Sequence, residues 1–413
     1  MKILEFSAYF YPEQYASSYL WQNVSEAFAR EGIERIVLCP TPCRGISEEK
    51  RQEYKRKENE TLYGGRLQVI RFPLYKEGKN PLSRAVRYII LVFYMLFWGI
   101  FSAKSKECQL LSVGSTPPIL GAMAAIVKIV RKVPFVYNLQ DIFPDSLVSA
   151  GLAKKGGLLW KIGRVIENFT YRNTDKIIVI SEDFKKNIMA KGVPEEKIEV
   201  IYNWVDEQAV VDISREKNVL FDRYGLDRNK FYVTYNGNIG LSQNLEMLMS
   251  IAKDLEGNDD IHFVLVGNGA YKEQLEKLIV DKNIRNVTLL PFQPYEEISH
   301  VFSLGDVSLV ISKPGVGVNS VPSKTWSIMS ASRPVLANFD ENELKTIIEE
   351  NNCGIFTKAG DKVTFTDAIL KLYNNREHCR EMGKNGRKFV MKNLTKEVGT
   401  QKYVDVIKSF DKK

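Results

Sequence analysis

The sequence predicts an α/β protein with two doubly wound parallel sheets, one in each half of the chain. Short apolar segments alternate with amphipathic segments throughout, and this alternation is typical of βαβ units in a parallel sheet covered by helices. A chain of 413 residues is too long for one hydrophobic core, because domains average about 150 residues. The apolar fraction of 44% indicates a folded globular protein.

The first domain is predicted to cover residues 1–205. The amphipathic segment Tyr19–Arg30 is a predicted helix, and Gly32 follows it as a glycine commonly follows a helix C-terminus. Six apolar segments of this domain are predicted strands: Ile3–Phe6, Arg35–Cys39, Val69–Phe72, Leu110–Val113, Phe135–Leu139 and Lys176–Ile180.

The second domain is predicted to cover residues 206–392. A last segment, residues 393–413, contains a predicted helix that we expect to pack back on the first domain. Two further amphipathic segments are predicted helices, Leu245–Leu255 and Tyr271–Val280. Five apolar segments are predicted strands: Tyr232–Tyr235, His262–Val266, Val287–Leu289, Val307–Ile311 and Val335–Asn338.

Cysteine and histidine usage predicts a cytoplasmic protein that needs no metal. The five cysteines are odd in number, scattered and without CxxC spacing, which favours free thiols over a disulfide framework or a zinc site. No secretory signal pattern opens the chain. No Asp-x-Asp pair follows an apolar strand and no His/Cys cluster occurs, so we expect neither a metal nor another cofactor.

The positive charge of the chain is confined to its first half. Residues 1–205 contain 30 Lys and Arg against 21 Asp and Glu, and the remaining residues carry a net charge of −1. A basic half predicts an anionic partner such as a phospholipid surface or a diphosphate-linked lipid. Nucleic acid is not expected, because no recognised binding motif occurs. The alternative is that the charge serves solubility.

An uncharged run of 14 residues, Tyr88 to Phe101, predicts a helix that dips into a membrane face. As a helix it would be about 21 Å long, shorter than the roughly 30 Å hydrocarbon core. Basic residues flank it and aromatic residues suit the headgroup boundary. A helix buried against a sheet is the alternative. The predicted membrane helix lies near residues 84–104, and its contact residues are Arg84, Arg87, Phe93, Phe97 and Trp98.

The segment Ile311–Phe339 predicts a diphosphate site. A Gly-rich loop runs into Pro322, Ser323 and Lys324, which open a predicted short helix. A helix N-terminus presents free N–H groups and a partial positive charge, and the lysine adds a mobile cation. An ordinary capped loop of an α/β protein fits the same residues.

The pattern V-P-S-K-x-x-x-x-M-x-x-x-R-P-V-x-A, Val321 to Ala337, resembles the donor segment of family 4 glycosyltransferases. The resemblance is to the branch that builds capsule, O-antigen and colanic acid repeat units. Other segments fall in the order expected of this family: Asn138–Ser146, Ile180–Glu182, Gly192–Pro194, Lys197–Asp206, Tyr235–Gly240, Val266–Gly269 and Leu289–Phe292.

The resemblance implies the GT-B fold, in which two Rossmann-like domains face each other across a cleft. It also implies a retaining hexosyl or N-acetylhexosaminyl transferase that uses a nucleotide-diphosphate sugar, with UDP expected as the nucleotide. The implied acceptor is a polyprenyl-diphosphate-linked saccharide at the inner face of a bacterial membrane, where we expect the enzyme to be peripheral.

The donor site is predicted from the same match. Many family members have two glutamates eight positions apart where this chain has Asn319 and Ser327, so amide and hydroxyl groups are expected to hold the donor here. The predicted diphosphate-binding residues are Lys324, Ser323, Gly237, Asn238 and Gly240. The predicted sugar- and nucleoside-binding residues are Asn319, Ser320, Ser327, Asn268, Gly269, Phe292 and Gln293.

Asp141 is the predicted catalytic carboxylate. It follows a predicted strand at the carboxyl end, where α/β sheets bind their ligands, and a helix N-cap is the alternative. Many family members have a histidine where this chain has Gln140. The predicted acceptor and cleft residues are Phe10, Tyr11, Glu13 and Gln140.

Two other functions remain open from the sequence. One is a non-hydrolysing nucleotide-sugar epimerase, which has the same architecture. The other is a catalytically silent GT-B protein that binds partners at the membrane, because the acidic pair of the family is absent.

Overall fold

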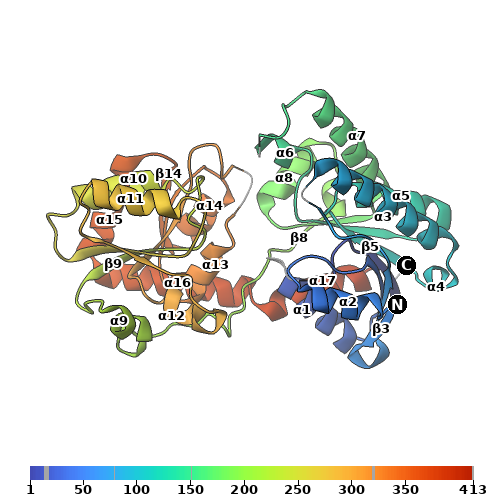
Figure 1. The fold of residues 1–413 in the computed structure, drawn as a ribbon, viewed down its shortest axis with the longest axis horizontal. Coiled ribbons are helices and arrows are strands. Elements are labelled where there is room, and N and C mark those ends of the chain that lie inside the picture. The colour runs from blue at the N-terminus through green and yellow to red at the C-terminus, as the bar shows by residue number, and fades with distance from the viewer. Residues whose placement is uncertain (14–17, 79, 150, 319–320, 412–413) are drawn as a thin grey trace. The chain divides into compact units, whose positions relative to one another are not determined.

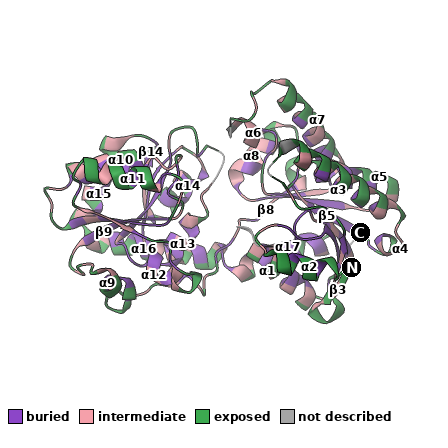
Figure 2. Cartoon of the chain, viewed as in Figure 1, coloured by how far each residue is buried: buried purple, intermediate pink, exposed green. Residues whose placement is uncertain are grey.

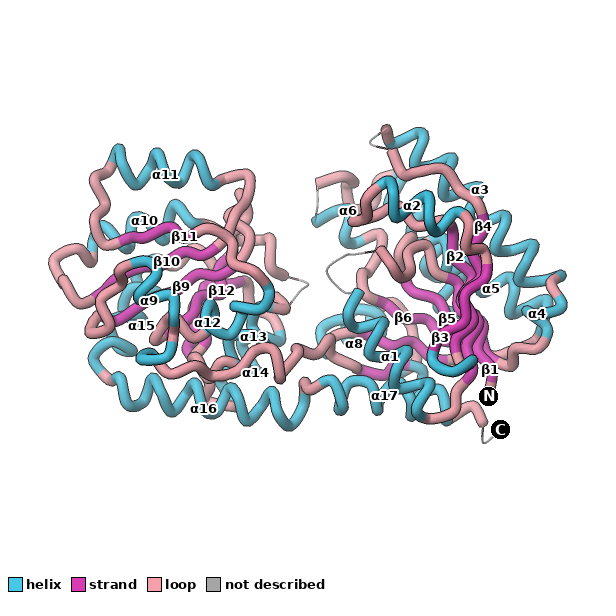
Figure 3. The backbone as a smooth tube through the Cα atoms, turned by 60° about the horizontal axis from the view of Figure 1, so that its bottom comes forward, coloured by secondary structure: helices cyan, strands magenta, loops and turns pink. Residues whose placement is uncertain are grey.

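The computed structural model describes residues 1–413 except 14–17, 79, 150, 319–320 and 412–413, and it forms two compact units (Figure 1). The N-terminal unit comprises Met1–Tyr202 and Gly399–Lys413, and the C-terminal unit comprises Asn203–Val398. Each unit has a central sheet with helices around it (Figure 3). The predicted fold class, two doubly wound α/β domains in series, is confirmed.

The N-terminal unit contains an eight-stranded sheet of order β3-β4-β2-β1-β5-β6-β7-β8. The strand pairs are parallel except for β3, which pairs antiparallel with β4. The strands are β1 Lys2–Phe6, β2 Glu34–Pro40, β3 Asn59–Leu62, β4 Leu67–Phe72, β5 Leu110–Gly114, β6 Phe135–Leu139, β7 Lys176–Val179 and β8 Ile198–Val200.

Helices cover both faces of this sheet. The helix α17, Lys396–Lys408, ends in this unit, where the hydroxyl of Tyr403 accepts a hydrogen bond from Asn138 Nδ2 at 2.7 Å. The other helices are α1 Ser18–Arg30, α2 Glu48–Lys55, η1 Tyr63–Gly65, α3 Pro81–Phe101, α4 Ala103–Lys106, α5 Ile119–Arg131, α6 Asp145–Ser149, α7 Leu158–Asn173, α8 Glu182–Ala190 and η2 Glu195–Lys197.

The C-terminal unit contains a six-stranded parallel sheet of order β11-β10-β9-β12-β13-β14. The strands are β9 Phe231–Asn236, β10 Ile261–Val266, β11 Val287–Leu290, β12 Val307–Ile311, β13 Val335–Phe339 and β14 Gly354–Lys358. The helices are η3 Arg215–Lys217, α9 Val219–Tyr224, α10 Leu245–Asp254, α11 Lys272–Asp281, η4 Tyr295–Glu297, α12 Ile298–Phe302, α13 Lys324–Ser330, α14 Glu343–Glu350, α15 Lys362–Asn374 and α16 Arg376–Asn393.

All eleven predicted strands occur, and three observed strands lack a strong sequence signal. The strands β3 and β14 are only partly buried and contain polar residues, and β8 has three residues. Ten of the eleven predicted strands lie inside the sheets, and the most central ones are buried on both faces and therefore form continuous apolar runs. The eleventh, β11, is a partly buried edge strand that was still predicted from its apolar residues. Sequence patterning thus found the internal strands and β11, and it missed the other three edge strands, β3, β8 and β14.

Candidate functional site

The predicted donor segment lies at the switch point of the C-terminal sheet. The strands β9 and β12 are neighbours, and the chain leaves them toward opposite edges of the sheet. Open α/β sheets bind ligands at the carboxyl ends of two such strands. The residues found there are Asn236 at the end of β9, Ser312 just after β12, and Lys324 at the start of α13.

Lys324 is a partly buried cation with no carboxylate partner among the described residues. Its Nζ lies 3.9 Å from the centroid of the Tyr235 ring, where the face of the ring attracts a cation. Burial lowers the pKa of Lys324 from 10.5 to about 7, because the ammonium loses hydration that no neighbouring anion replaces. A phosphate bound at this position would supply the missing negative charge.

Buried polar atoms without hydrogen-bond partners belong to residues of the same segments: the end of β9, the residue after β12 and the first turn of α13. Both amide atoms of Asn236, the hydroxyl of Ser312 and the hydroxyl of Thr325 have no hydrogen-bond partner within the described part of the chain. Each buried group of this kind costs about 1–3 kcal/mol, so such groups are rare unless a ligand or water satisfies them. None of these three residues is among the predicted site residues. Asn236 and Ser312 could have been found from the sequence, because each is a polar residue at the end of an apolar strand.

The turn after β9 does not present its glycine amides to a ligand. The amide of Gly237 donates to the carbonyl of Val266 at 2.9 Å, and the amide of Gly240 donates to Gln243 Oε1 at 3.1 Å. The prediction that Gly237 and Gly240 bind phosphate through their N–H groups is therefore wrong. The acceptor of the Gly237 amide is on the neighbouring strand β10, which is distant in sequence, so the residues around Gly237 do not reveal it.

The glycines of this region allow two turns to approach each other closely. A Cβ atom on Gly267 would lie 1.9 Å from the carbonyl oxygen of Gly237, and a Cβ atom on Gly269 would lie 2.2 Å from the carbonyl oxygen of Ile239. A Cβ atom on Gly237 would lie 3.2 Å from Lys324 Nζ. The glycines thus hold the ends of β9 and β10 together and leave space for the lysine.

Five other predicted donor residues lie around this switch point, and no contact assigns their role: Asn238, Asn268, Gly269, Ser323 and Ser327. Asn238 and Asn268 are exposed, and Asn268 Oδ1 accepts the amide of Gly269 at 2.9 Å. Ser323 is exposed and precedes α13 without a side-chain hydrogen bond to the helix. Ser327 is partly buried in α13. Their roles in donor binding stay predictions.

The structure separates the remaining predicted donor residues. Phe292 is exposed after β11, but the side chain of Gln293 is buried. The Gln293 amide bonds to Arg223, to the hydroxyl of Tyr224 and to the carbonyl of Pro291. All these partners of the Gln293 side chain belong to the protein itself. The prediction that this side chain contacts the nucleoside is therefore wrong. The predicted residues Asn319 and Ser320 lie outside the described residues.

The N-terminal unit has a cavity of about 140 Å³ at the switch point of its own sheet. The strands β1 and β5 are neighbours there, and the chain leaves them toward opposite edges. The cavity lies at the carboxyl ends of β1, β5 and β6 and is polar on one side. Its polar and aromatic lining includes Ser7, Tyr9, Phe10, Trp21, Arg44, Ser115, Asn138 and Gln140.

Hydrogen bonds order the polar side of this cavity. Gln140 Nε2 donates to Asn138 Oδ1 at 2.8 Å, and the amide of Gln140 donates to Ser115 Oγ at 3.0 Å. Asn138 is in turn bonded to Tyr403. The predicted acceptor residue Gln140 therefore lies in a cavity at the ligand-binding edge of the sheet.

Asp141 lies next to this cavity but is not one of its lining residues. Its amide donates to Ser115 Oγ at 3.2 Å, and the residue is exposed. Loss of solvation raises the pKa of the Asp141 carboxyl, while the Ser146 hydroxyl and the Ile142 amide oppose that shift. Asp141 is not an N-cap, because α6 begins at Asp145. Its catalytic role stays a prediction.

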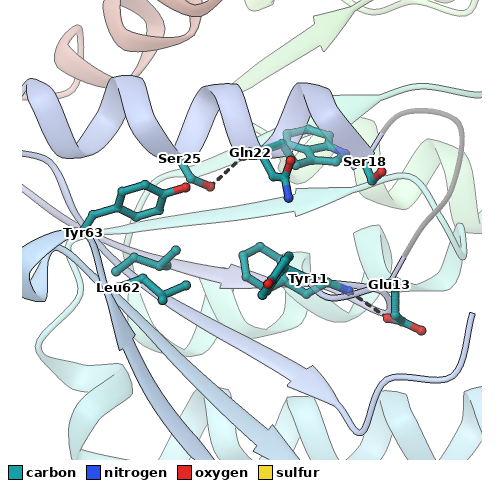
Figure 4. A pocket seen from close by; sticks show the side chains of 10 residues that line it. Tyr11, Glu13, Ser18, Gln22, Ser25, Leu62 and Tyr63 are labelled. Carbon is teal, nitrogen blue, oxygen red and sulfur yellow. Dashed lines mark hydrogen bonds between the residues drawn. The ribbon is translucent and has the colours of Figure 1, made fainter. Parts of the chain in front are cut away.

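The other predicted acceptor residues belong mainly to a second cavity, of about 280 Å³ (Figure 4). Tyr11 is exposed and lines this cavity between α1 and the β3 region. Glu13 is buried, and its carboxylate accepts the amides of Phe10, Cys43 and Arg44 at 2.7–2.9 Å. Glu13 lines this cavity as a cleft residue, but backbone amides already occupy its carboxylate, and its contact with an acceptor stays a prediction. Phe10 borders both cavities.

The helix α3 exposes one apolar side and buries the other. Phe93 and Phe97 are 66% and 68% exposed, whereas Leu91 and Met95 are fully buried against the sheet. The predicted helix of 14 residues is 21 residues long, or about 31 Å. Among the described residues it is the one helix long and apolar enough to cross a membrane by length and composition.

One predicted membrane-contact residue of α3 is inside the protein. Arg87 is fully buried, and its guanidinium donates to the carbonyl of Tyr75 at 3.0 Å and to Cys43 Sγ at 3.5 Å. The prediction of Arg87 as a membrane residue is wrong, because one side of α3 packs on the sheet. Trp98 is partly buried and packs against the hydrophobic core, and its membrane contact stays a prediction.

The exposed apolar surface continues from α3 across two neighbouring helices. The helices α5 and α7 follow α3 across the unit (Figure 1), and exposed residues cover their outer sides (Figure 2). We call the exposed apolar side chains of these helices the three-helix face: Leu82, Val86, Ile89, Ile90, Phe93, Tyr94, Phe97 and Phe101 of α3, Ile119, Ile126, Ile129 and Val130 of α5, and Leu158, Leu159, Ile162, Val165 and Phe169 of α7.

Groups that could hold a metal do not gather in the described chain. No set of three or more His, Cys, Asp or Glu side chains is placed to bind an ion among the residues outside the gaps at 14–17, 79, 150, 319–320 and 412–413. The five cysteines are buried and unpaired. Lys324 in one unit and Arg44 in the other are cationic side chains at the two switch points.

Comparison with known proteins identifies relatives of both halves of the chain. Residues 18–209 match the model of the family described as Glycosyltransferase Family 4, and residues 216–389 match the model described as Glycosyl transferases group 1. WbjE of Pseudomonas aeruginosa, named as a glycosyltransferase, is 25% identical over 83% of this chain and 84% of that protein. WcaI of Escherichia coli, whose name places it in colanic acid biosynthesis as a glycosyl transferase, is 27% identical over 80% and 81%.

Solved structures show the same fold. HepE of Anabaena in complex with UDP has a TM-score of 0.72 and 16% identity, and the match covers 99% of this chain and 100% of that chain. WaaG, a glycosyltransferase involved in lipopolysaccharide biosynthesis, has a TM-score of 0.67 and 12% identity over 98% and 99%. The architecture of two parallel-sheet α/β domains is that of the GT-B fold.

Proposed function

The chain belongs to glycosyltransferase family 4, and from that premise we propose that it transfers a sugar from a UDP-sugar to a lipid-linked saccharide in the synthesis of a bacterial surface polysaccharide. The observation that carries the proposal is Lys324, a cation at the switch point of the C-terminal sheet that has no counter-ion among the described residues. The names of WcaI, from colanic acid biosynthesis, and WaaG, from lipopolysaccharide biosynthesis, support a role in the synthesis of surface glycans.

The chemistry assigned to Lys324 is stabilisation of the departing diphosphate. Cleavage of the bond between sugar and diphosphate leaves negative charge on the leaving group, and a fixed cation lowers the energy of that state. Lys324 lies at the start of α13 and against the Tyr235 ring, so its position is restricted before a ligand arrives. The amide of Asn236 and the hydroxyls of Ser312 and Thr325 offer further hydrogen bonds to the donor.

UDP is the proposed nucleotide. The support is the likeness to HepE, for which structures with UDP and with UDP-glucose are known. Titration calorimetry with UDP, GDP, ADP and CDP tests this assignment, and we expect UDP to bind most tightly. Binding of no nucleoside diphosphate would refute the transferase function and favour a silent binding protein.

Transfer to an acceptor distinguishes the proposed enzyme from an epimerase. Incubation with a UDP-sugar alone should leave the sugar unchanged, whereas an epimerase would convert it without an acceptor. We propose that transfer retains the configuration of the anomeric carbon, on the basis of family resemblance alone. Proton NMR of the first product reports the configuration, and an inverted product would refute retention.

We propose a peripheral position on the cytoplasmic side of the membrane, held by the three-helix face. The support is the size of that apolar surface together with the positive charge of the N-terminal half. A face of this kind lies in the interfacial layer with its aromatic side chains among the headgroups.

Vesicle flotation tests the membrane position. Wild-type protein should float with vesicles that contain phosphatidylglycerol, and Phe93→Asp should reduce the bound fraction at least fivefold. Val280→Asp is the matched control, because Val280 is 76% exposed but lies on α11 of the other unit. Equal flotation of the two variants would refute the assignment of the three-helix face.

A further inference from the structure

Two arginines of the N-terminal unit share one carboxylate. Glu77 accepts hydrogen bonds from Arg44 Nε at 3.0 Å and Nη2 at 3.2 Å, and Arg84 Nε lies 3.0 Å from the same carboxylate. The hydroxyls of Tyr9 and Tyr88 donate to it at 3.0 Å and 3.2 Å. We call these five residues the Glu77 cluster. Burial opposes ionisation of Glu77, but the bonds and the charge of Arg44 outweigh it and lower its pKa to about 2.

The Glu77 cluster carries an excess of positive charge. The guanidinium groups of Arg44 and Arg84 face the single carboxylate of Glu77. Two cations against one carboxylate leave the cluster with a net charge of +1.

The geometry leaves the cations on the outside and the carboxylate beneath. The side chains of Arg44 and Arg84 are 38% and 46% exposed, but that of Glu77 is 11% exposed. The guanidinium of Arg44 lies 3.8 Å from the centroid of the Tyr9 ring, which restricts its orientation. Each guanidinium has five N–H donors, and the bonds to Glu77 use only some of them. The remaining donors can bind an anion.

The cluster connects two features that the proposed function uses. Arg44 lines the cavity that contains Gln140 at the switch point of the sheet. Arg84 belongs to the first turns of α3, beside the exposed apolar residues Leu82 and Val86 of the three-helix face. An acceptor whose sugar enters the cavity and whose lipid lies along α3 has its anionic group between the two.

We propose that Arg44 and Arg84 bind the diphosphate of the lipid-linked acceptor. The inference rests on the proposed function and deepens it, because it assigns the charged part of the acceptor to two residues. Arginine suits this task because its planar fork bonds phosphate oxygens in pairs. Glu77 holds both guanidiniums in place, and the diphosphate binds their remaining N–H groups and competes with Glu77 for their positive charge.

Farnesyl diphosphate in detergent micelles is the probe for this site, and titration calorimetry on the full-length protein measures its affinity. Arg44→Ala and Arg84→Ala should each weaken binding at least about tenfold, the scale of a hydrogen bond to a charged group. Glu77→Gln should preserve or strengthen binding, because the competing charge is removed. Arg66→Ala is the matched control, since Arg66 is 47% exposed and pairs only loosely with Glu34 at 3.7 Å.

Two further measurements separate charge recognition from other effects. Farnesol should bind all variants alike, because it lacks the diphosphate. Arg44→Lys keeps the charge without the fork, and it should show intermediate affinity while folding normally by circular dichroism. UDP binding by these variants should stay at the wild-type level, because the donor residues belong to the C-terminal unit.

Several results would overturn the inference. One is unchanged farnesyl diphosphate binding in Arg44→Ala and Arg84→Ala, and another is an equal loss in Arg66→Ala. Inorganic pyrophosphate binding as tightly as farnesyl diphosphate would show that the site takes a free anion, and it would refute the lipid-linked acceptor. A protein that binds farnesyl diphosphate through both arginines but binds no nucleotide would refute the proposed function and leave this site in place.

Discussion

Replacing Lys324 by methionine should stabilise the C-terminal unit and remove diphosphate binding in one step. Methionine keeps an unbranched apolar chain but carries no charge. The fall in the pKa of Lys324 from 10.5 to about 7 corresponds to about 5 kcal/mol of lost ammonium solvation, at about 1.4 kcal/mol for each unit of pKa. At pH 7 about half of the folded molecules have a neutral lysine, so the cost to folding is at most about 4 kcal/mol.

The pH dependence of stability follows from the direction of this pKa shift. Between about pH 7 and pH 10.5 the unfolded chain holds a proton on Lys324 that the folded chain has released. Unfolding therefore takes up a proton, and stability rises with pH in this window. The advantage of Lys324→Met should be largest at pH 7 and below, and it should disappear as the pH approaches 10.5.

Nucleotide binding should show the opposite pH dependence. A bound diphosphate stabilises the ammonium and raises its pKa, so binding above pH 7 takes up a proton. The affinity for UDP should fall by up to about tenfold for each pH unit above 7, and calorimetry in buffers of different ionisation enthalpy should detect the proton. Lys324→Met should weaken UDP binding about 10- to 100-fold and lose the pH dependence.

Thermal unfolding and titration calorimetry together test the reasoning about Lys324. We expect the midpoint of the C-terminal transition to rise by several degrees at pH 7, because a unit of this size gains about 2–4 °C for each kcal/mol. Lys345→Met is the control, since Lys345 is 36% exposed and is paired with Glu341. A Lys324→Met protein that is less stable than wild type, or that binds UDP normally, would refute the reasoning.

Three other changes have definite expected outcomes. Thr325→Val should stabilise the protein by about 1 kcal/mol, because a buried hydroxyl without a partner disappears, and should weaken UDP binding severalfold; destabilisation would show that the hydroxyl is already satisfied. Gly267→Ala should destabilise by more than about 3 kcal/mol or prevent folding, because its Cβ would lie 1.9 Å from a carbonyl oxygen, whereas Gly257→Ala, with no atom within 4 Å, should be close to neutral in urea unfolding. Asp141→Asn should lower the rate of transfer about 100-fold with UDP binding unchanged, and full activity in a folded protein would end the catalytic assignment.

Local patterns predicted those features that depend on the chain near each residue. The alternation of apolar segments predicted the central strands, because a strand that is buried on both faces consists of consecutive apolar residues. The segment before α13 predicted Lys324 as the first residue of a short helix. Both inferences need only the chemistry of a few neighbouring residues.

The wrong predictions depend on partners that are distant in sequence. The amide of Gly237 is bonded to β10, and the side chain of Gln293 is bonded to Arg223 and Tyr224, about 70 residues away. Arg87 flanks an apolar run as a membrane anchor would, but its acceptors are Tyr75 and Cys43. In each case the sequence shows a polar group and does not show which group satisfies it.

The two cationic sites differ in how the protein holds their charge, and this difference predicts different roles. Lys324 has no counter-ion in the described chain, and its ammonium has lost hydration on folding. A bound diphosphate therefore stabilises the ammonium and offsets that loss of solvation free energy. Arg44 and Arg84 are already paired with Glu77, so a bound anion shares their charge with that carboxylate and is stabilised less. The first arrangement suits a group whose charge grows during reaction, because stabilisation increases with that charge. The second suits a lipid substrate that must be released after each transfer, because tight binding of its unreacting diphosphate would slow turnover without lowering the barrier.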